Sequence, residues 1–217
     1  SPARYVEIYR EIEPFVQMVD AQSLAGDLGL EGPVMSKFEV LTGMAFAAFA
    51  DAPVDVGVIE VGMGGSWDAT NVVDALIAVI TPIGVDHAEY LGATVGEIAA
   101  EKAGVIRGPR GEIVPVETIA VIARQPSEAM DVLLAHAVRV AAVVAREDAE
   151  FAVRNRQVAI GGQVLELQGL GGVYPDVYLP LHGEHQAHNA VVALAAVEAF
   201  FGAGAQRQLD IDTVRAG

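Results

Sequence analysis

The chain has 217 residues and a formal net charge of -16 at pH 7, and 53% of its residues are hydrophobic. This size and apolar content suit one α/β domain with a substantial core. The acidity argues against a nucleic-acid partner and against an anionic membrane surface, because both require clustered Lys and Arg. It does not exclude an anionic substrate, since a divalent cation or backbone N–H groups can reverse the field locally.

The chain contains no cysteine, which excludes disulfides, thiolate nucleophiles and Cys-type metal sites. No apolar run reaches the roughly 20 residues that span a bilayer, and no secretory signal opens the chain. We therefore expect a soluble, cytoplasmic protein, and a monomer. Because the sequence starts at Ser1 without Met and stops at Gly217 in an expected helix, we also expect a fragment that is truncated at both ends.

Two helices are predicted before the first strand. Ser1 followed by Pro2 is a typical helix start, and apolar residues then recur at helical spacing. Ser36 and Glu39 fit a capping box for a second helix, which runs to about Ala50.

Three near-continuous apolar runs follow, at residues 54–59, 75–80 and 118–122. Runs without polar alternation are typical of parallel strands that are buried on both faces. Helices predicted at residues 93–106 and 126–142 alternate with the last two runs. The pattern predicts an α/β fold with a mostly parallel, doubly wound sheet flanked by helices.

The pattern changes at Val143. Short strands near residues 151–153, 157–167 and 173–181 predict a small antiparallel β-sheet, with Gly161-Gly162 as a hairpin turn. A last strong helix begins near Glu184. We expect one domain over residues 1–217, with a parallel α/β part at about 1–142, the small antiparallel sheet at about 143–181 and returning helices at about 184–217.

Two polar residues follow the first two predicted strands. Glu60 comes directly after the first strand, and His87 follows the second. Ligands of parallel sheets gather beyond the carboxyl ends of the strands, where a buried carboxylate needs a cation or hydrogen bonds. Glu60 could instead cap a turn or pair with an arginine, and an isolated His is usually only a satisfied polar residue. Their placement on adjacent strand ends favours a shared site for a catalytic Mg²⁺, completed by water and phosphate.

A glycine-rich turn, Gly62-x-Gly64-Gly65, follows Glu60. It is not a Walker A loop, because no Gly-Lys-Ser/Thr follows it or occurs elsewhere in the sequence. Asp68 and Asn71 beside it could contact a ligand, although such residues in turns are commonly structural.

Lys102 lies in an otherwise apolar helix. By default such a lysine is a surface residue paired with Glu101 or Glu97, and the spacing alone does not favour another role.

Five segments stand in a recognisable order and spacing, at residues 38–42, 60–71, 83–92, 101–106 and 183–190. Together they resemble the central ATPase domain of the folylpolyglutamate synthase/dihydrofolate synthase family, within the Mur ligase superfamily. The resemblance extends over essentially the whole chain. It implies a P-loop NTPase-like fold and an ATP-dependent ligase of folate biosynthesis and one-carbon metabolism.

The resemblance also implies a mechanism. ATP would phosphorylate the carboxylate of folate or of dihydropteroate, and the amino group of L-glutamate would attack the resulting acyl phosphate to give an amide. In-line phosphoryl transfer depends mostly on positioning and charge neutralisation, which explains a Mg²⁺ at Glu60 and His87. Lys102 corresponds to a lysine that is carbamylated, a change that would make it a carboxylate-like ligand of a second metal and the third catalytic residue.

Further positions correspond to binding residues of the family. Asn189 corresponds to a contact of the nucleotide base, and His185 lies beside it in the same motif. The positions of the pterin pocket correspond to Phe38, Asp68 and Ala69.

The sequence departs from the family pattern in four places. Ser66 stands where the family usually carries Arg, and the segment from Arg107 to Glu117 is longer than the family's short turn. The phosphate loop expected before Ser1 and the Rossmann-like C-terminal domain expected after Gly217 are not among these residues. We therefore expect the fragment alone not to catalyse ligation.

Two other functions fit parts of the sequence. One is a Mur-type peptidoglycan precursor ligase acting on a UDP-linked peptide, but residues 60–71 and Asp86-His87 fit the folate branch better. The other is a non-catalytic binding or assembly domain. The missing phosphate loop supports it, whereas Glu60, His87 and Lys102 argue against it, because a scaffold does not require them.

Overall fold

The computed structural model of the chain describes residues 1–26, 32–52, 54–86, 88–108, 117–202 and 208–217. These residues form two compact units. The first consists of Ser1–Met63 with Trp67–Val73, and the second of Gly64–Ser66 with Asp74–Gly217.

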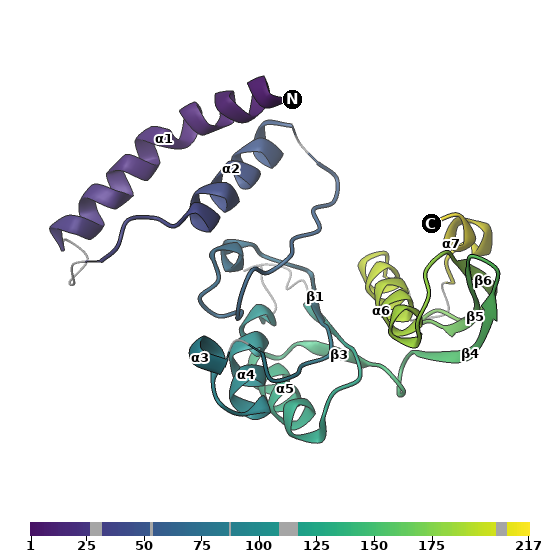
Figure 1. The fold of residues 1–217 in the computed structure, drawn as a ribbon. Helices are drawn as coiled ribbons and strands as arrows, with labels where there is room; N and C mark the ends of the chain where they lie inside the picture. Colours follow the sequence, from purple (N-terminus) through teal and green to yellow (C-terminus); the bar gives the residue numbers. More distant parts are fainter. Residues whose placement is uncertain (27–31, 53, 87, 109–116, 203–207) are drawn as a thin grey trace. The chain divides into compact units, whose positions relative to one another are not determined.

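The first unit is built on two helices, α1 (Pro2–Ala25) and α2 (Lys37–Asp51), which pack side by side (Figure 1). The Ser1 hydroxyl caps α1, and α2 begins with the predicted capping box between Ser36 and Glu39. Their apolar stripes bury little: Ile8 is the buried residue of α1 and Met44 that of α2. The helix starts are therefore fixed by local hydrogen bonds more than by a core.

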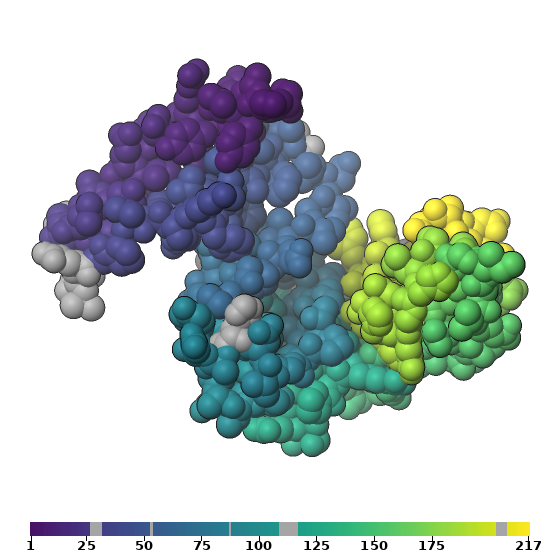
Figure 2. Space-filling view, viewed as in Figure 1, coloured from purple at the N-terminus to yellow at the C-terminus, as the bar shows by residue number. Residues whose placement is uncertain are grey.

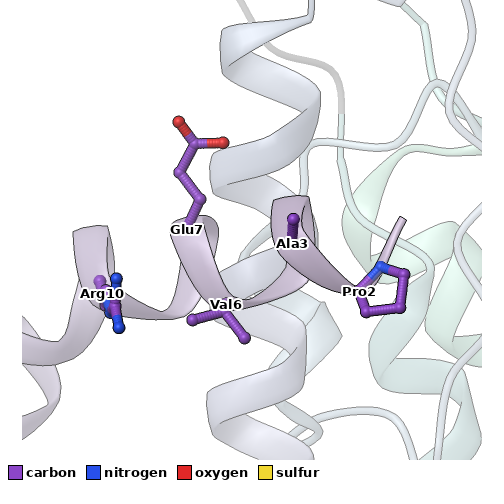
Figure 3. A pocket seen from close by; sticks show the side chains of 5 residues that line it. All are labelled: Pro2, Ala3, Val6, Glu7 and Arg10. Atoms are coloured by element: carbon purple, nitrogen blue, oxygen red, sulfur yellow. The ribbon is translucent and has the colours of Figure 1, made fainter.

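A hollow on α1 is lined by residues of that helix alone. Figure 3 shows that its lining side chains all come from the first ten residues of the chain: Pro2, Ala3, Val6, Glu7 and Arg10. The hollow is thus an open helix surface rather than an enclosed site.

Residues 54–59 do not form the strand that their apolar character predicts. The chain there is extended without ladder pairing, and Val54, Val56 and Val58 are exposed, Val58 to 93%. A strand exists only where a neighbour supplies hydrogen bonds, and no described strand pairs with this segment. A short 3₁₀ turn, η1 (Ala69–Val72), ends this unit.

The second unit contains the predicted parallel sheet. Its strands β1 (Ile77–Ile80), β2 (Ile119–Ile122) and β3 (Val143–Arg146) pair in sequence order and run parallel. The connection between β1 and β2 carries α3 (Ala88–Leu91), α4 (Val95–Lys102) and η2 (Ala103–Val105), and α5 (Ser127–Val140) connects β2 to β3. The change expected at Val143 therefore falls one strand too early, because β3 completes the parallel sheet.

A separate antiparallel sheet follows, as predicted. It consists of β4 (Ala152–Ala159), β5 (Gly162–Gln168) and β6 (Val173–Leu179), in that order. Gly161, with φ of 77°, makes the turn between β4 and β5. The chain then forms α6 (Glu184–Phe200) and α7 (Ile211–Ala216), and the yellow atoms of α7 lie against β6 in Figure 2.

One apolar core joins the two sheets through α6. Side chains of α6 pack with residues from both sheets in a single buried cluster, whose members include Val121, Ala123, Phe151, Leu165, Leu167, Val191, Leu194 and Ala195. Alternate residues of β2, Ala120 and Ile122, are fully buried on the other side of the strand. The predicted fold class is confirmed. No described helix combines the length and the apolar content that crossing a membrane requires.

A buried carboxylate anchors the C-terminal half of α6. Glu198 is fully buried and accepts hydrogen bonds from the Leu170 N–H at 2.5 Å, the Gly171 N–H at 3.0 Å and the Tyr174 hydroxyl at 2.6 Å. The Tyr174 oxygen in turn accepts the Leu209 N–H at 2.8 Å. Burial, together with the hydrogen bond to Glu198, raises the pKa of Tyr174 above its usual range. The hydroxyl therefore stays protonated and links α6, β6 and the segment before α7.

We predict that Tyr174→Phe lowers the free energy of unfolding by about 1–3 kcal/mol, because it leaves Glu198 short of one donor and the Leu209 N–H without its acceptor. Tyr178→Phe is the matched control, since its hydroxyl donates to the Ile160 carbonyl in an exposed setting, and it should cost no more than about 0.5 kcal/mol. Urea denaturation measures both. Equal losses in the two variants would contradict the role of the buried hydroxyl.

Candidate functional site

In the first unit, an aromatic ring lies over a glycine. Phe38, in the first turn of α2, is 42% exposed, and its ring approaches Gly62 so closely that an added Cβ would lie 2.5 Å from a ring carbon. A side chain at position 62 would displace the ring. Gly62 thus lets Phe38 lie against the turn while part of the ring faces solvent, as stacking on a flat ligand requires.

Asp68 organises the same turn from within. It is 7% exposed, its Oδ2 accepts the Met63 N–H at 2.9 Å, and its Oδ1 accepts the Thr70 N–H at 2.9 Å. Burial alone would raise the pKa of Asp68, but hydrogen bonds from Thr70, Met63 and Gly62 hold it below its usual value. Both carboxylate oxygens therefore stabilise the turn and place Ala69 at the start of η1. This is the structural role that the sequence left open.

In the second unit, the turn Gly64–Ser66 packs on the end of α4. The Ser66 N–H donates to the Glu101 carbonyl at 3.2 Å and to its Oε1 at 2.9 Å. A Cβ on Gly65 would lie 2.6 Å from the Glu101 carbonyl oxygen, and one on Gly104 would collide with Ser66. The glycines therefore permit a close backbone contact that fixes the end of the helix carrying Lys102.

Lys102 is half-buried in the last turn of α4, and it does not form the ion pairs expected by default. The Glu97 carboxylate accepts the Ala93 N–H at 2.7 Å and the Thr94 N–H at 3.1 Å, as part of the α4 capping box. The Glu101 carboxylate accepts the Ser66 N–H. Both candidate partners are thus used by backbone amides, and Lys102 has no ion pair with a described residue.

Of the two predicted metal ligands, the structure describes Glu60 and not His87. Glu60 is exposed, and its carboxylate forms no hydrogen bond or ion pair with a described residue. His87 lies outside the described residues, between Asp86 and the start of α3. Within the described ranges, no three acidic, His or Cys side chains gather as a metal site would require. The shared Mg²⁺ site stays a prediction.

The predicted nucleotide contacts lie on the first two turns of α6. The His185 ring packs against Gly183, whose φ of 101° opens the helix. Asn189 is exposed, and its Nδ2 donates to the Gln186 Oε1 at 3.2 Å. One turn apart, His185 and Asn189 share a helix face, as the sequence motif implies.

A charged network beside this helix was not predicted. The Arg124 Nη2 donates to the Asp148 Oδ1 at 2.7 Å, and its Nη1 lies 3.2 Å from the His188 Nε2. The other nitrogen of His188 is hydrogen-bonded to Glu147, whose side chain is fully buried. Hydrogen bonding to Asp148 raises the pKa of Arg124, and the same contact lowers the pKa of Asp148. Only the placement of Arg124 just after β2 hints at this network in the sequence.

We predict that Gly65→Ala lowers the free energy of unfolding by about 1–3 kcal/mol, because the methyl group overlaps carbonyl oxygens that cannot move independently of α4. Gly84→Ala is the control, since a Cβ there meets no atom within 4 Å, and its effect should stay within about 0.5 kcal/mol. Chemical denaturation compares the two. A neutral Gly65→Ala would show that the turn does not rest on the helix end.

Residues 31–197 of the chain match the family model of the Mur ligase middle domain. This match covers α2, both sheets and most of α6, so it includes the elements that carry the candidate site.

Individual relatives agree with the family match. A Mycobacterium tuberculosis protein named dihydrofolate synthase/folylpolyglutamate synthase is 70% identical over 218 residues, covering 100% of this chain and 44% of that protein. The M. tuberculosis folylpolyglutamate synthase solved in complex with ADP superposes with a TM-score of 0.88 at 66% identity, over 100% of this chain and 45% of the solved one. A solved FPGS-AMPPCP-folate complex gives a TM-score of 0.81 at 25% identity, over 97% of this chain and 47% of its own. The chain thus spans less than half the length of these relatives.

Proposed function

Because this chain belongs to the Mur ligase middle-domain family, we propose that it supplies the ATP-using part of a ligase that adds L-glutamate to folate or to dihydropteroate. The observation that carries this proposal is the 70% identity, over the whole chain, to a protein named for both activities. The same similarity favours folate over the UDP-linked peptide of a peptidoglycan ligase. These 217 residues contain no Gly-Lys-Ser/Thr loop of the Walker A type, and we expect the chain alone to be inactive in ligation.

The reaction has two steps. The γ-phosphoryl group of ATP passes to a carboxylate oxygen of the folate substrate, which gives an acyl phosphate and ADP. The amino group of glutamate attacks the acyl carbon, and the tetrahedral intermediate expels phosphate as the amide forms. The protein contributes mainly by positioning the reactants and by neutralising charge.

Each substrate is assigned to groups with suitable chemistry. The exposed amide of Asn189 is proposed to contact the nucleotide base, with the His185 ring beside it on the same helix face. The exposed face of Phe38 is proposed to stack on the flat pterin ring. Asp68 and Ala69 are proposed to contribute through the turn that Asp68 holds, because both oxygens of that carboxylate are already used.

Glu60 is proposed to hold Mg²⁺, which would neutralise negative charge on the transferring phosphoryl group. Its exposed carboxylate, without a described hydrogen-bond partner, is a donor of the kind that Mg²⁺ prefers. His87 is the second proposed ligand. Carbamylation of Lys102 would replace an ammonium by an oxygen donor, and no described residue forms an ion pair with that amine.

We predict that Glu60→Gln lowers ATP-dependent glutamate addition by the whole gene product about 100-fold or more, because an amide oxygen is a weaker Mg²⁺ ligand than a carboxylate. The exposed Glu11 on α1 provides the control, and Glu11→Gln should leave turnover near normal. Glutamate addition is followed by chromatography of the folate product, with circular dichroism to verify folding. Turnover near normal in Glu60→Gln would remove Glu60 from the metal site.

We predict that Lys102 gains one carbon dioxide in bicarbonate buffer and that Lys37 does not. These are the two lysines of the chain, so intact-mass and ¹³C-bicarbonate NMR measurements have a simple background. Lys37 is exposed at the start of α2 and serves as the internal control, with Lys102→Arg to assign the signal. A carbamate signal that persists in Lys102→Arg, or none in the unmodified sequence, would count against the assignment.

A further inference from the structure

Three arginines border a hollow beside the antiparallel sheet. The hollow has a volume of about 230 Å³, and its walls are formed by Arg154, Asn155 and Arg156 of β4 and by Arg124, Glu184 and His188 opposite them. Arg124 is paired with Asp148 and Glu184 lines the hollow too, but in a chain with 13 basic against 29 acidic residues the two arginines of β4 have no such partner among the described residues. Neither Asn189 nor His185 lines the hollow.

The strand is irregular where it forms the wall. In a regular strand successive side chains point to opposite faces, whereas four consecutive residues of β4, Val153 to Arg156, border this hollow. The pairing register of β4 with β5 shifts between Val153 and Asn155, which leaves Arg154 outside the ladder. A bulge of this kind redirects a side chain. The irregularity therefore falls on Arg154, one of the two arginines of this wall.

Neutral partners orient the two arginines of β4. The Arg156 Nε donates to the Gln163 Oε1 at 2.6 Å, and Arg154 donates to Gln168. Neither arginine forms an ion pair with a described residue, and Glu184 is the carboxylate that borders the same hollow. The glutamines use the Arg154 Nη2 and the Arg156 Nε, so the Arg154 Nη1 and both terminal nitrogens of Arg156 can donate to a ligand.

The support for Arg156 continues into the core. Gln163 is 1% exposed, and its Nε2 donates to the carbonyls of Leu181 at 2.9 Å and Gly183 at 3.1 Å. Across the hollow, Arg124 donates from Nε and Nη2 to the two carboxylate oxygens of Asp148, and its Nη1 lies next to His188. The guanidinium groups that are oriented before any ligand arrives and that have no carboxylate partner are therefore those of β4.

We propose that this hollow binds a phosphate-type oxyanion through Arg154 and Arg156. A guanidinium presents N–H donors in a planar arrangement that suits the oxygens of an anion. A tetrahedral oxyanion has oxygens facing several directions and can accept from two guanidinium groups at once, whereas one group satisfies a flat carboxylate. Glu184 lies at the rim with a side chain that is 74% exposed, so it can turn to solvent when an anion enters. The proposal does not depend on the proposed ligase activity.

The test is a titration of the 217-residue chain with inorganic phosphate at constant ionic strength, followed by calorimetry and by the Nε–H NMR signals of the arginines. The double variant Arg154→Gln, Arg156→Gln should bind phosphate about tenfold or more weakly, the loss expected for charge-assisted hydrogen bonds. Arg156→Lys keeps the charge but not the planar arrangement of donors and should retain only part of the affinity. Arg139→Gln, an exposed arginine of α5, is the matched control and should bind as the unmodified chain does.

Two results would overturn the proposal: no saturable binding of phosphate up to tens of millimolar, or equal affinity in the double variant and in Arg139→Gln. Because Arg154 and Arg156 are exposed, the variants should keep the thermal transition of the unmodified chain. A parallel titration with ADP identifies the source of the anion. If the double variant loses ADP affinity as well, the site takes a nucleotide phosphate, and if ADP binding is unchanged, it takes free phosphate.

Discussion

The position of α6 between two sheets is the constraint on which the second unit depends. Its apolar residues pack in one cluster with β2 of the parallel sheet and with all three antiparallel strands. At its C-terminal half, Glu198 fastens it to the 169–172 turn and to Tyr174. At its N-terminal turn, His188 joins it to Glu147 and Arg124. A helix held at both ends in this way gives His185, Asn189 and the arginine-lined hollow a fixed frame.

The end of α4 is fixed by a different principle. There the two backbones are in direct contact, because Gly65 and Gly104 have no side chains where the turn meets the end of the helix. The carboxylates of Glu97 and Glu101 are both consumed by amide N–H groups, one at each end of the helix. The ammonium of Lys102 is left without either of its obvious partners. Burying part of an unpaired ammonium costs free energy, and this supports the proposed chemical modification of Lys102.

Features determined locally were predictable from the sequence. The capping box at Ser36 and the hairpin turn at Gly161 follow from short patterns, because their hydrogen bonds join neighbours in the chain. Strands β1 and β2 were predicted from their continuous apolar runs, although each pairs with a distant segment. The resemblance to the folate ligases likewise rested on linked motifs, and the family match agrees with it.

Features that depend on distant partners were not predictable. Residues 54–59 have the composition of a strand, but strand formation depends on a neighbour and not on composition. The start of β3 at Val143 was missed because the run is short and follows directly after α5. No sequence pattern indicated that both carboxylate oxygens of Asp68 accept hydrogen bonds within its own turn. Nor did one indicate the hydrogen bond between His188 and Glu147, which lie 41 residues apart. The metal site that Glu60 and His87 would share remains a prediction.

The strand order β4-β5-β6 has a consequence for how copies of the protein meet. β4 stands at the border of its sheet, where unpaired amide and carbonyl groups offer a template to a strand from another molecule. Arg154 and Arg156 place two like charges along that border, and the displaced register at Arg154 breaks its regular ladder. Two molecules approaching each other along β4 would therefore meet charge repulsion and a mismatched hydrogen-bond pattern, which disfavours aggregation at this edge of the sheet.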